Sequence, residues 1–344
     1  IRREQRMIYD VYGVGNALVD MEYRVDEGFL RQHGIDKGHM TLVDEPRMDA
    51  LIDALRELEH ERISGGSAAN TIYAVQAFGG RAFYSCRLAD DATGQHFLSD
   101  LREAGVMTNA NALLPAVPGK SGRCLVLVTP DAERTMNTFL GISTALTPVD
   151  LDTGALRASR YLYLEGYLSS GASALDAAVA AREEAESARI KTAVSLSDVS
   201  MVRFFREGLT RILGNGVEQL FCNEEEALEW AGTDRLDIAA RELRDIGREV
   251  CITLGKHGCM VVDAHSTHTV PGYPAQPVDT NGAGDIFAGS VLFARARGKE
   301  PAVAAAFGNF AAAGLVTQYG ARFRHTATYR AKRDEFNRAA REVV

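Results

Sequence analysis

The sequence predicts an α/β fold with a mostly parallel central sheet, helices on both of its faces and a small β lid. Two observations carry this prediction. In the middle and end of the chain, short β-rich runs alternate with stretches of helical periodicity, which is typical of a parallel sheet covered by helices. In the first part, several extended runs follow one another with turn residues between them, and they are too short to form a domain of their own.

The first part of the chain is expected to supply one strand of the main sheet and the lid. MIYDVYGVGN, at 7–16, reads as a strand, and extended runs follow at 18–25, 38–44 and 123–139. We interpret inserts at about 17–45 and 108–139 as a small sheet on the edge of the main one, which can close as a lid. Because no Pro/Gly/Ser-rich linker divides the chain, a single domain is expected over 7–340.

The rest of the chain alternates strands and helices. Apolar residues at helical spacing predict the helices, and runs of β-branched and aromatic residues predict the strands. In chain order the expected elements are a helix at 68–79, a strand at 160–166, a helix at 173–189, a strand at 190–197, a helix at 201–213, a strand at 217–223, helices at 224–231 and 235–247, strands at 249–255 and 259–263, and a helix beginning at 282.

Length and composition exclude several classes of function. The 344 residues are 46% hydrophobic and 24% charged, a normal balance for a soluble globular protein. The net charge of −8 argues against a nucleic-acid partner, which requires a basic surface, although a local pocket can still bind a small anion. No run of about 18 apolar residues predicts a membrane span, and the charged start IRREQRM lacks the apolar segment of a signal peptide, so a cytoplasmic location is expected.

The five cysteines and eight histidines do not indicate disulfide or metal chemistry. The number of cysteines is odd, no CxxC pair occurs, and most cysteines lie in apolar, strand-like contexts. The histidines show neither HExxH nor another metal-binding spacing. Buried thiols in a reducing cytosol are therefore expected.

The stretch DTNGAGDIFAGS, from Asp279 to Ser290, predicts an anion site at the start of a helix. The helix is expected to begin at Gly282, so that Gly282, Ala283 and Gly284 form its first turn, whose N–H groups have no partner inside the helix. Asp285 follows directly, and a carboxylate there can accept a proton from an attacking hydroxyl while the amides hold the developing negative charge. The structural alternative is a capped helix, with Asp279 or Asn281 as the cap and Asp285 stabilised by the helix dipole.

SGGSAANT, from Ser64 to Thr71, places two glycines before a serine of N-cap type and a helix. Read alone, it can be an ordinary turn from a strand into a helix. The functional interpretation is a bare backbone surface at Gly65 and Gly66 that a ligand can approach. Asn70 then points into the cleft, where its donors and acceptor suit a sugar hydroxyl.

GVGNALVD, from Gly13 to Asp20, invites comparison with a dinucleotide-binding turn. The comparison fails, because Leu18 stands at the third glycine position and a strand, rather than a helix, is expected to follow. Assignment of the chain as a nicotinamide dehydrogenase would have this GVG as its only support. Instead, Asn16 and Asp20 leave the strand end four residues apart, and an ionised Asp20 can accept two hydroxyls of a vicinal diol; the alternative is a surface acid in a loop.

CNEEEA, from Cys222 to Ala227, holds Asn223 and Glu226 at the end of a strand. An Asn at the N-cap with a Glu three residues later is a capping box, which is the structural interpretation. The functional alternative is an acid that holds a water on Mg²⁺, because this ion keeps several waters and often takes only one or two protein contacts.

Two further glycine-containing stretches are candidates for a phosphate site. TLGKHG, from Thr253 to Gly258, is a turn between two strands, and it can also lie against the phosphates of a nucleotide. PAVPGKSGR contains the Gly-Lys-Ser fragment of a P-loop. Leu114 stands where the first P-loop glycine is required and no helix follows, so a P-loop is rejected.

Taken in order, these stretches resemble the ribokinase-like (PfkB) family of sugar and nucleoside kinases. The resemblance spans nearly the whole chain, from GVGNALVD to FGNFAAAGLVTQYGA, and DTNGAGDIFAGS is a specific signature of the family. GGSAANT resembles its N-terminal glycine motif and NEEEA its N-x-x-E magnesium motif. GNALVD together with DEGFL most resembles the adenosine-kinase-like branch. The resemblance implies a three-layer α/β/α fold with a β lid.

The resemblance also implies roles for individual residues. Asp285 resembles the catalytic base, beside an anion hole of Gly282, Ala283 and Gly284. The residues that resemble the acceptor site are Asp20, Gly65, Gly66 and Asn70, with Asn16 at the place where the adenosine branch touches the base. Asn223 and Glu226 resemble the Mg²⁺ and phosphate network, and the ATP site is lined by Thr253, Gly255, Gly258 and Asn309. Asp279 and Asn281 fall where members bind a monovalent cation such as K⁺, which not all members need.

The expected activity is transfer of the γ-phosphoryl group of ATP, with Mg²⁺, to a primary hydroxyl of a nucleoside or a sugar. A hexose, pentose or sugar acid is the alternative acceptor, and a non-catalytic sugar- or nucleotide-binding protein on the same fold is the alternative of another class. One departure concerns the base: where similar adenosine kinases place an aromatic against adenine, this chain has Ser200, with Phe204 and Phe205 nearby. The resemblance allows either a monomer or a homodimer paired through its lids.

Overall fold

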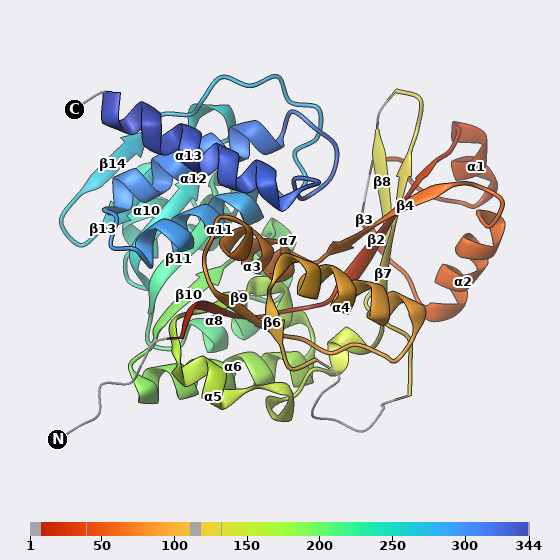
Figure 1. Cartoon of the computed structure of the whole chain (residues 1–344), viewed down its shortest axis with the longest axis horizontal. Coiled ribbons are helices and arrows are strands. Elements are labelled where there is room, and N and C mark those ends of the chain that lie inside the picture. The colour runs from red at the N-terminus through yellow and green to blue at the C-terminus, as the bar shows by residue number, and fades with distance from the viewer. Residues whose placement is uncertain (1–7, 39, 111–117, 132, 343–344) are drawn as a thin grey trace.

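The computed structural model describes residues 8–38, 40–110, 118–131 and 133–342, and their strands form two sheets (Figure 1). The larger sheet has the order β14-β13-β12-β11-β10-β9-β1-β5-β6. Its neighbours pair in parallel from β12 to β6, and β13 and β14 add an antiparallel edge. The predicted α/β class with a mostly parallel sheet is confirmed. The strands are β1 Tyr9–Val14, β5 Ala82–Ser85, β6 Met107–Thr108, β9 Ser159–Glu165, β10 Lys191–Ser195, β11 Val217–Asn223, β12 Gly247–Thr253, β13 Cys259–Asp263 and β14 Thr267–Val270.

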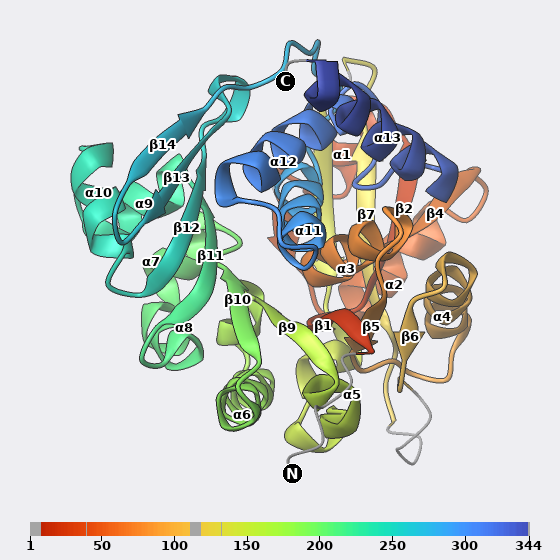
Figure 2. The ribbon, with the colours of Figure 1, turned by 60° about the vertical axis from the view of Figure 1, so that its left-hand side comes forward.

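Helices cover both faces of this sheet, as Figure 2 shows. One face carries α3 Ser67–Ala77, α4 Ala92–Ala104, α11 Ala283–Arg295, α12 Pro301–Leu315 and α13 Thr326–Glu342. The other carries α5 Thr153–Arg157, α6 Ala172–Ala188, α7 Val199–Phe204, α8 Arg206–Leu213, α9 Glu224–Ala231 and α10 Leu236–Leu243. The expected helix at 201–213 is therefore two helices, because Phe205 leaves helical geometry between them and packs against the core.

Alternate residues of each strand point to opposite faces, so the sheet separates two hydrophobic cores. In β1, Val11 belongs to the core under α3 and α11, whereas Tyr12 belongs to the core under α5 and α6. β9 repeats this pattern with Tyr163 on the first face and Leu164 on the second. Burial on both faces explains why these strands read as continuous apolar runs in the sequence.

The smaller sheet stands beside the main one and has the order β3-β8-β7-β2-β4 (Figure 1). Its strands are β2 Leu18–Arg24, β3 Met40–Leu42, β4 His60–Gly65, β7 Gly122–Val128 and β8 Arg134–Phe139. The short helices α1 Glu27–Gln32 and α2 Glu45–Ala54 accompany it. β4 lies outside the inserts predicted at 17–45 and 108–139, and Thr108 belongs to the main sheet. β4 was missed because its partner is β2, about 40 residues earlier in the chain, so only the antiparallel pairing reveals it.

Some predicted positions lie outside the described residues. These are Met7 of the first expected strand, His39, residues 111–117 and Ala132 within the expected inserts, and Leu114 of the rejected P-loop. The five cysteines are all described, and all are buried and free, as expected. Among the described residues no helix has the length and apolar character that crossing a membrane requires.

Close packing of α3 against α11 holds the two glycine motifs of the sequence together. A Cβ placed at Gly289 of α11 would lie 2.7 Å from the carbonyl oxygen of Thr71 and 2.8 Å from Cβ of Ala74, both on α3. A glycine at this position lets the two helix backbones approach closely. Since α3 begins in SGGSAANT and α11 in DTNGAGD, this contact sets the distance between those two helix starts.

We predict that Gly289→Ala destabilises the protein although alanine is the better helix former. The added methyl group must push against backbone of α3, and such overpacking costs about 1–3 kcal/mol, more than the ~1 kcal/mol gain in helix propensity. Chemical denaturation measures the free energy of unfolding. Gly284→Ala in the same helix is the matched control, because a Cβ there meets nothing within 4 Å. Equal stability of the two variants would show that the helices do not pack this closely.

Candidate active site

The predicted site residues gather where the parallel strands end. β1, β9, β11 and β12 run in the same direction, so Asn16, Glu165, Asn223 and Thr253 follow or close them at one edge of the sheet. The starts of α3 and α11 lie at this edge, and the smaller sheet stands beside it (Figure 1). The carboxyl edge of a parallel sheet is the usual place for a ligand in such folds.

The start of α11 has the bare backbone that the motif predicts. Gly282 is the N-cap with φ 74°, and a Cβ there would lie 2.6 Å from Cα of Ala321, so both the conformation and the space require glycine. The N–H groups of Gly282 and Gly284 find no partner among the described residues. The N–H of Ala283, however, donates to the carbonyl of Thr280 at 3.2 Å and closes the turn. Two of the three expected anion-binding amides are thus available.

Asp285 lies three residues after this N-cap and is held by α3. Its Oδ1 accepts a hydrogen bond from the hydroxyl of Ser67 at 2.6 Å, and its Oδ2 accepts one from Nδ2 of Asn70 at 2.9 Å. Burial raises the pKa of Asp285 to about 6, while the hydrogen bonds from Ser67 and Asn70 act in the opposite direction. Ser67 was expected as an N-cap, but Gly66 takes that position and leaves the hydroxyl free to reach Asp285.

Asp20 lies on β2 of the smaller sheet, beside the start of α3. A Cβ at Gly65 would lie 2.8 Å from Oδ1 of Asp20, so this glycine makes room for the carboxylate. Burial raises the pKa of Asp20 to about 6, and the charges of Arg322 and Arg134 oppose the shift. Since the Asp20 carboxylate has no hydrogen-bond partner among the described residues, its acceptor oxygens remain available for hydroxyl groups of a ligand.

Glu165 was not predicted, yet it joins three segments of the site. Its Oε1 accepts from the backbone N–H of Asn16 at 2.7 Å and from Nδ2 of Asn16 at 2.9 Å, and its Oε2 accepts from the N–H of Ala68 at 2.7 Å. Glu165 is 1% exposed, and this burial raises its pKa to about 7. Gly66 must be a glycine because a Cβ there would clash with the carbonyl of Asn16. Glu165 therefore fixes Asn16 and the start of α3 relative to each other.

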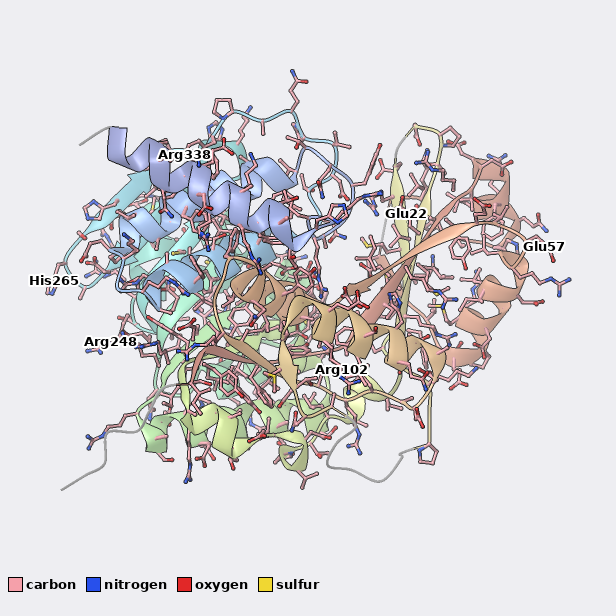
Figure 3. All side chains as sticks on the ribbon, in the orientation of Figure 1. Glu22, Glu57, Arg102, Arg248, His265 and Arg338 are labelled. Carbon is pink, nitrogen blue, oxygen red and sulfur yellow. The ribbon has the colours of Figure 1, made fainter. Side chains whose placement is uncertain are left out.

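Two arginines were also missed by sequence analysis. Arg322 lies between α12 and α13, and its Nε donates to Oδ1 of Asn70 at 2.7 Å. Arg134 on β8 forms ion pairs with Glu22 of β2, which is labelled in Figure 3, and with Asp279. Neither arginine belongs to a glycine motif, so their place in the site depends on contacts between distant segments.

Asp279 and Asn281 form a compact turn before α11. Oδ1 of Asp279 accepts from the N–H of Asn281 at 3.0 Å, and Oδ2 accepts from the N–H of Gly320 at 2.8 Å and from Arg134. A guanidinium group therefore already balances the charge of this buried carboxylate. This arrangement does not fit a monovalent cation held by the Asp279 side chain, so the expected K⁺ contact is not supported at that group.

Asn223 and Glu226 form the capping box of α9. The side chain of Asn223 accepts from the N–H of Glu226 at 2.8 Å, and the Glu226 carboxylate accepts from the N–H and Nδ2 of Asn223. Burial raises the pKa of Glu226 to about 7, and the negative charge of Asp198 adds to the shift. A divalent cation nearby would relieve this unfavourable burial of charge, so these residues fit Mg²⁺ held through water.

The residues expected to line the ATP site fall into two groups, three in a hairpin turn and one on α12. Thr253 ends β12, and Gly255 and Gly258, with φ 55° and 94°, form the hairpin turn to β13. Nδ2 of Asn309 donates to the backbone carbonyls of Val270 and Pro271, each at 3.1 Å. The Asn309 amide therefore supports the loop after β14, and its contact with ATP stays a prediction.

The region expected to pack on a nucleobase lacks an aromatic side chain at Ser200. Ser200 lies in the first turn of α7 and hydrogen-bonds Asp198 through its N–H at 2.7 Å and through its hydroxyl. Phe204 is 70% exposed at the end of α7, whereas Phe205 packs against the hydrophobic core.

Comparison with known proteins agrees with this geometry. The E. coli K12 guanosine-inosine kinase is 26% identical over 162 residues, which are 46% of this chain and 37% of that protein. Two solved structures cover nearly the whole chain. A probable sugar kinase from Rhizobium etli CFN 42 superposes with a TM-score of 0.85 at 30% identity, covering 95% of this chain and 99% of that one. The adenosine kinase from Sinorhizobium meliloti does so with a TM-score of 0.84 at 34% identity, covering 98% and 99%.

The family match extends over most of the sequence. Residues 48–327 match the pfkB family carbohydrate kinase, a segment that includes the starts of α3 and α11, the capping box of α9 and the hairpin after β12. The resemblance inferred from the glycine motifs is thereby confirmed, and the ribokinase-like fold with it. This chain belongs to the pfkB family of carbohydrate kinases.

Proposed function

We propose that this protein is a kinase that transfers the γ-phosphoryl group of ATP to a primary hydroxyl of a nucleoside. The observation that carries the proposal is the Asp285 carboxylate, held by Ser67 and Asn70 beside the unpartnered amides that open α11. The acceptor oxygen forms a bond to the γ-phosphorus, the bond from that phosphorus to the bridging oxygen of ADP breaks, and the hydroxyl proton passes to Asp285. The amides of Gly282 and Gly284 stabilise the negative charge of the phosphoryl oxygens.

The acceptor is oriented by groups around the start of α3. The free carboxylate of Asp20 suits the two neighbouring hydroxyls of a ribose, and Asn70 lies beside Asp285, where the reacting hydroxyl must stand. These contacts select a sugar ring with a vicinal diol rather than a particular base. The likeness to adenosine kinase from S. meliloti and to guanosine-inosine kinase from E. coli supports a nucleoside, while Ser200 in place of an aromatic argues against strict selection of adenine.

Mg²⁺ with ATP is part of this proposal. Glu226 and Asn223 would hold it through water, and the ion would neutralise charge on the phosphates. The smaller sheet would act as a lid that excludes water, within a single domain spanning 7–340. Five buried free thiols fit a reducing compartment, so we place the protein in the cytoplasm.

Replacement of Asp285 by Asn tests the base. Asparagine keeps the size of the side chain but cannot accept the hydroxyl proton, so turnover is expected to fall by about 10²–10⁴-fold. Initial rates of ADP formation with the best acceptor measure the effect. Asp245→Asn, on the opposite edge of the sheet, is the matched control and should leave the rate unchanged. A kinase rate close to that of the wild type in Asp285→Asn would exclude this residue as the base.

The pH dependence of kcat/KM provides a second test. Asp285 acts as a base only when it is deprotonated, and its pKa is raised to about 6. The rate is therefore expected to rise with pH through about 6 and to level off near neutrality, with Asp20 adding to the loss on the acid side because its pKa is raised likewise. Activity that stays constant from about pH 5 to 8 would contradict both assignments.

A screen of acceptors tests the substrate class. ATP consumption is measured with adenosine, guanosine, inosine, cytidine, ribose, a hexose and a sugar acid, each with Mg²⁺. Purine nucleosides are expected to give the highest kcat/KM, with a preference among bases weaker than about 100-fold, because stacking on one aromatic side chain is worth about 1–3 kcal/mol. A clear preference for a hexose or sugar acid would make the protein a sugar kinase. Thermal shifts with ligands but no turnover with any acceptor would indicate a binding protein.

A further inference from the structure

Arg322 is a buried cation next to the proposed catalytic machinery. It lies in the segment between α12 and α13, and it is 5% exposed. Its Nε donates to Oδ1 of Asn70 at 2.7 Å, and its Nη1 donates to the carboxylate of Asp100 on α4 at 2.7 Å. The guanidinium carbon also lies 4.4 Å from the ring centroid of Tyr73 on α3. Three contacts thus hold its plane in one orientation.

The contact with Asn70 continues to Asp285. A guanidinium group can only donate, and an ionised carboxylate can only accept. Arg322 therefore requires the oxygen of the Asn70 amide to face it, which turns Nδ2 toward Oδ2 of Asp285 at 2.9 Å. The contact with Arg322 and the contact with Asp285 both require this orientation of the Asn70 amide. A change in the position of Arg322 would move Asn70 and, through it, the Asp285 carboxylate.

One donor of Arg322 is uncommitted. Nη2 is buried and has no hydrogen-bond partner among the described residues. In the planar guanidinium group, Nη2 shares an edge with Nε, so its N–H points to the same side as the contact with Asn70. Arg322 therefore keeps one buried donor that its contacts with Asn70, Asp100 and Tyr73 leave unsatisfied.

The positive charge of Arg322 also acts on acids of several elements. It opposes the effect of burial on the pKa of Asp20 on β2 and of Asp285 on α11. The other titratable groups around it are Asp100 on α4 and the phenols of Tyr73 on α3, Tyr84 on β5 and Tyr329 on α13. Arg322 is therefore placed to influence both the orientation and the protonation of the proposed base.

We infer that Arg322 is a positioning residue for phosphoryl transfer, which holds the Asn70 amide so that the Asp285 carboxylate stays aimed at the acceptor hydroxyl. The inference rests on the proposed kinase activity and deepens it. It assigns a role in the reaction to a residue outside the glycine motifs. The acceptor itself remains in contact with Asp20, Asn70 and Asp285.

A double-mutant cycle with Asn70 tests whether Arg322 acts through it. At about pH 8.5, where Asp285 is ionised in every variant, Arg322→Gln is expected to lower kcat by about 10–100-fold, the usual cost of a misplaced catalytic group. In an Asn70→Ala background the same substitution should change kcat by no more than about twofold, because the residue through which it acts is gone. An equal loss in both backgrounds, or an unchanged kcat in folded Arg322→Gln, would overturn the inference.

Arg322→Lys separates charge from geometry. Lysine keeps the positive charge, so the acid limb of the pH–rate profile should stay at the wild-type position, whereas in Arg322→Gln it should move to higher pH. kcat should still fall in Arg322→Lys, because one ammonium group cannot hold Asn70 and Asp100 in a fixed plane. Arg182→Gln is the matched control, since Arg182 is also a buried arginine, 7% exposed, but it lies on α6 across the sheet and pairs with Glu183 and Glu186. A loss of kcat in Arg182→Gln as large as that in Arg322→Gln would show that removing a buried arginine acts only through the fold.

Failure of the proposed function can be told apart from failure of this inference. Wild-type turnover is measured first, and its absence with every acceptor contradicts the kinase assignment alone. A crystal structure of Arg322→Gln then examines the contact without activity. We expect the Asn70 amide to rotate and to lose its hydrogen bond to Asp285. If the Asn70–Asp285 contact is retained in that structure, Arg322 does not position Asn70.

Discussion

The Asp285 carboxylate, partly buried where α11 begins and held there by α3, is the interaction on which the site depends. A buried carboxylate is costly unless donors surround it. Ser67 and Asn70 supply these donors from the first turn of α3, so the two helices must start at the same place. The close approach of their backbones at Gly289 makes this possible, since the helices cross near enough for short side chains to span the gap. The close packing of α3 against α11 therefore also fixes the position of the proposed base.

A second carboxylate, that of Glu165, helps to fix the position of Asp285 without touching it. Glu165 ends β9 and accepts hydrogen bonds from Asn16 after β1 and from Ala68 in α3. It fixes the start of α3 relative to the sheet, and α3 in turn holds Asp285. Burial raises the pKa of Glu165 to about 7 and that of Asp285 to about 6, because both carboxylates are withdrawn from water. The charge of Arg322 opposes the pKa shifts of Asp285 and Asp20, and that of Arg134 opposes the shift of Asp20, although neither arginine belongs to a glycine motif.

Whether a feature of the site could be predicted depended on how far apart its residues lie in the sequence. The helix start at Gly282, the acid at Asp285 and the capping box of Asn223 and Glu226 are local patterns, because the residues involved are neighbours in the chain. Partners brought together by folding were not predicted. Arg322 and Asn70 are 252 positions apart, and no periodicity or spacing connects them. The family resemblance placed Asn309 at ATP, and it gave no sign that the Asn309 amide donates to the backbone carbonyls of Val270 and Pro271.

The sequence by itself determined the class of fold, the alternation of strands and helices between about 160 and 263, the family and the turn that opens α11. Hydrophobic periodicity and glycine conformation are properties of short segments, so they can be recognised without knowing which other segments pack against them. Only the tertiary structure decided that β4 joins the smaller sheet, that Ser67 serves Asp285 instead of capping α3, and that Arg134 balances Asp279. Each of these results depends on which distant segments become neighbours, because hydrogen bonds and ion pairs form only over a few ångströms in the folded chain.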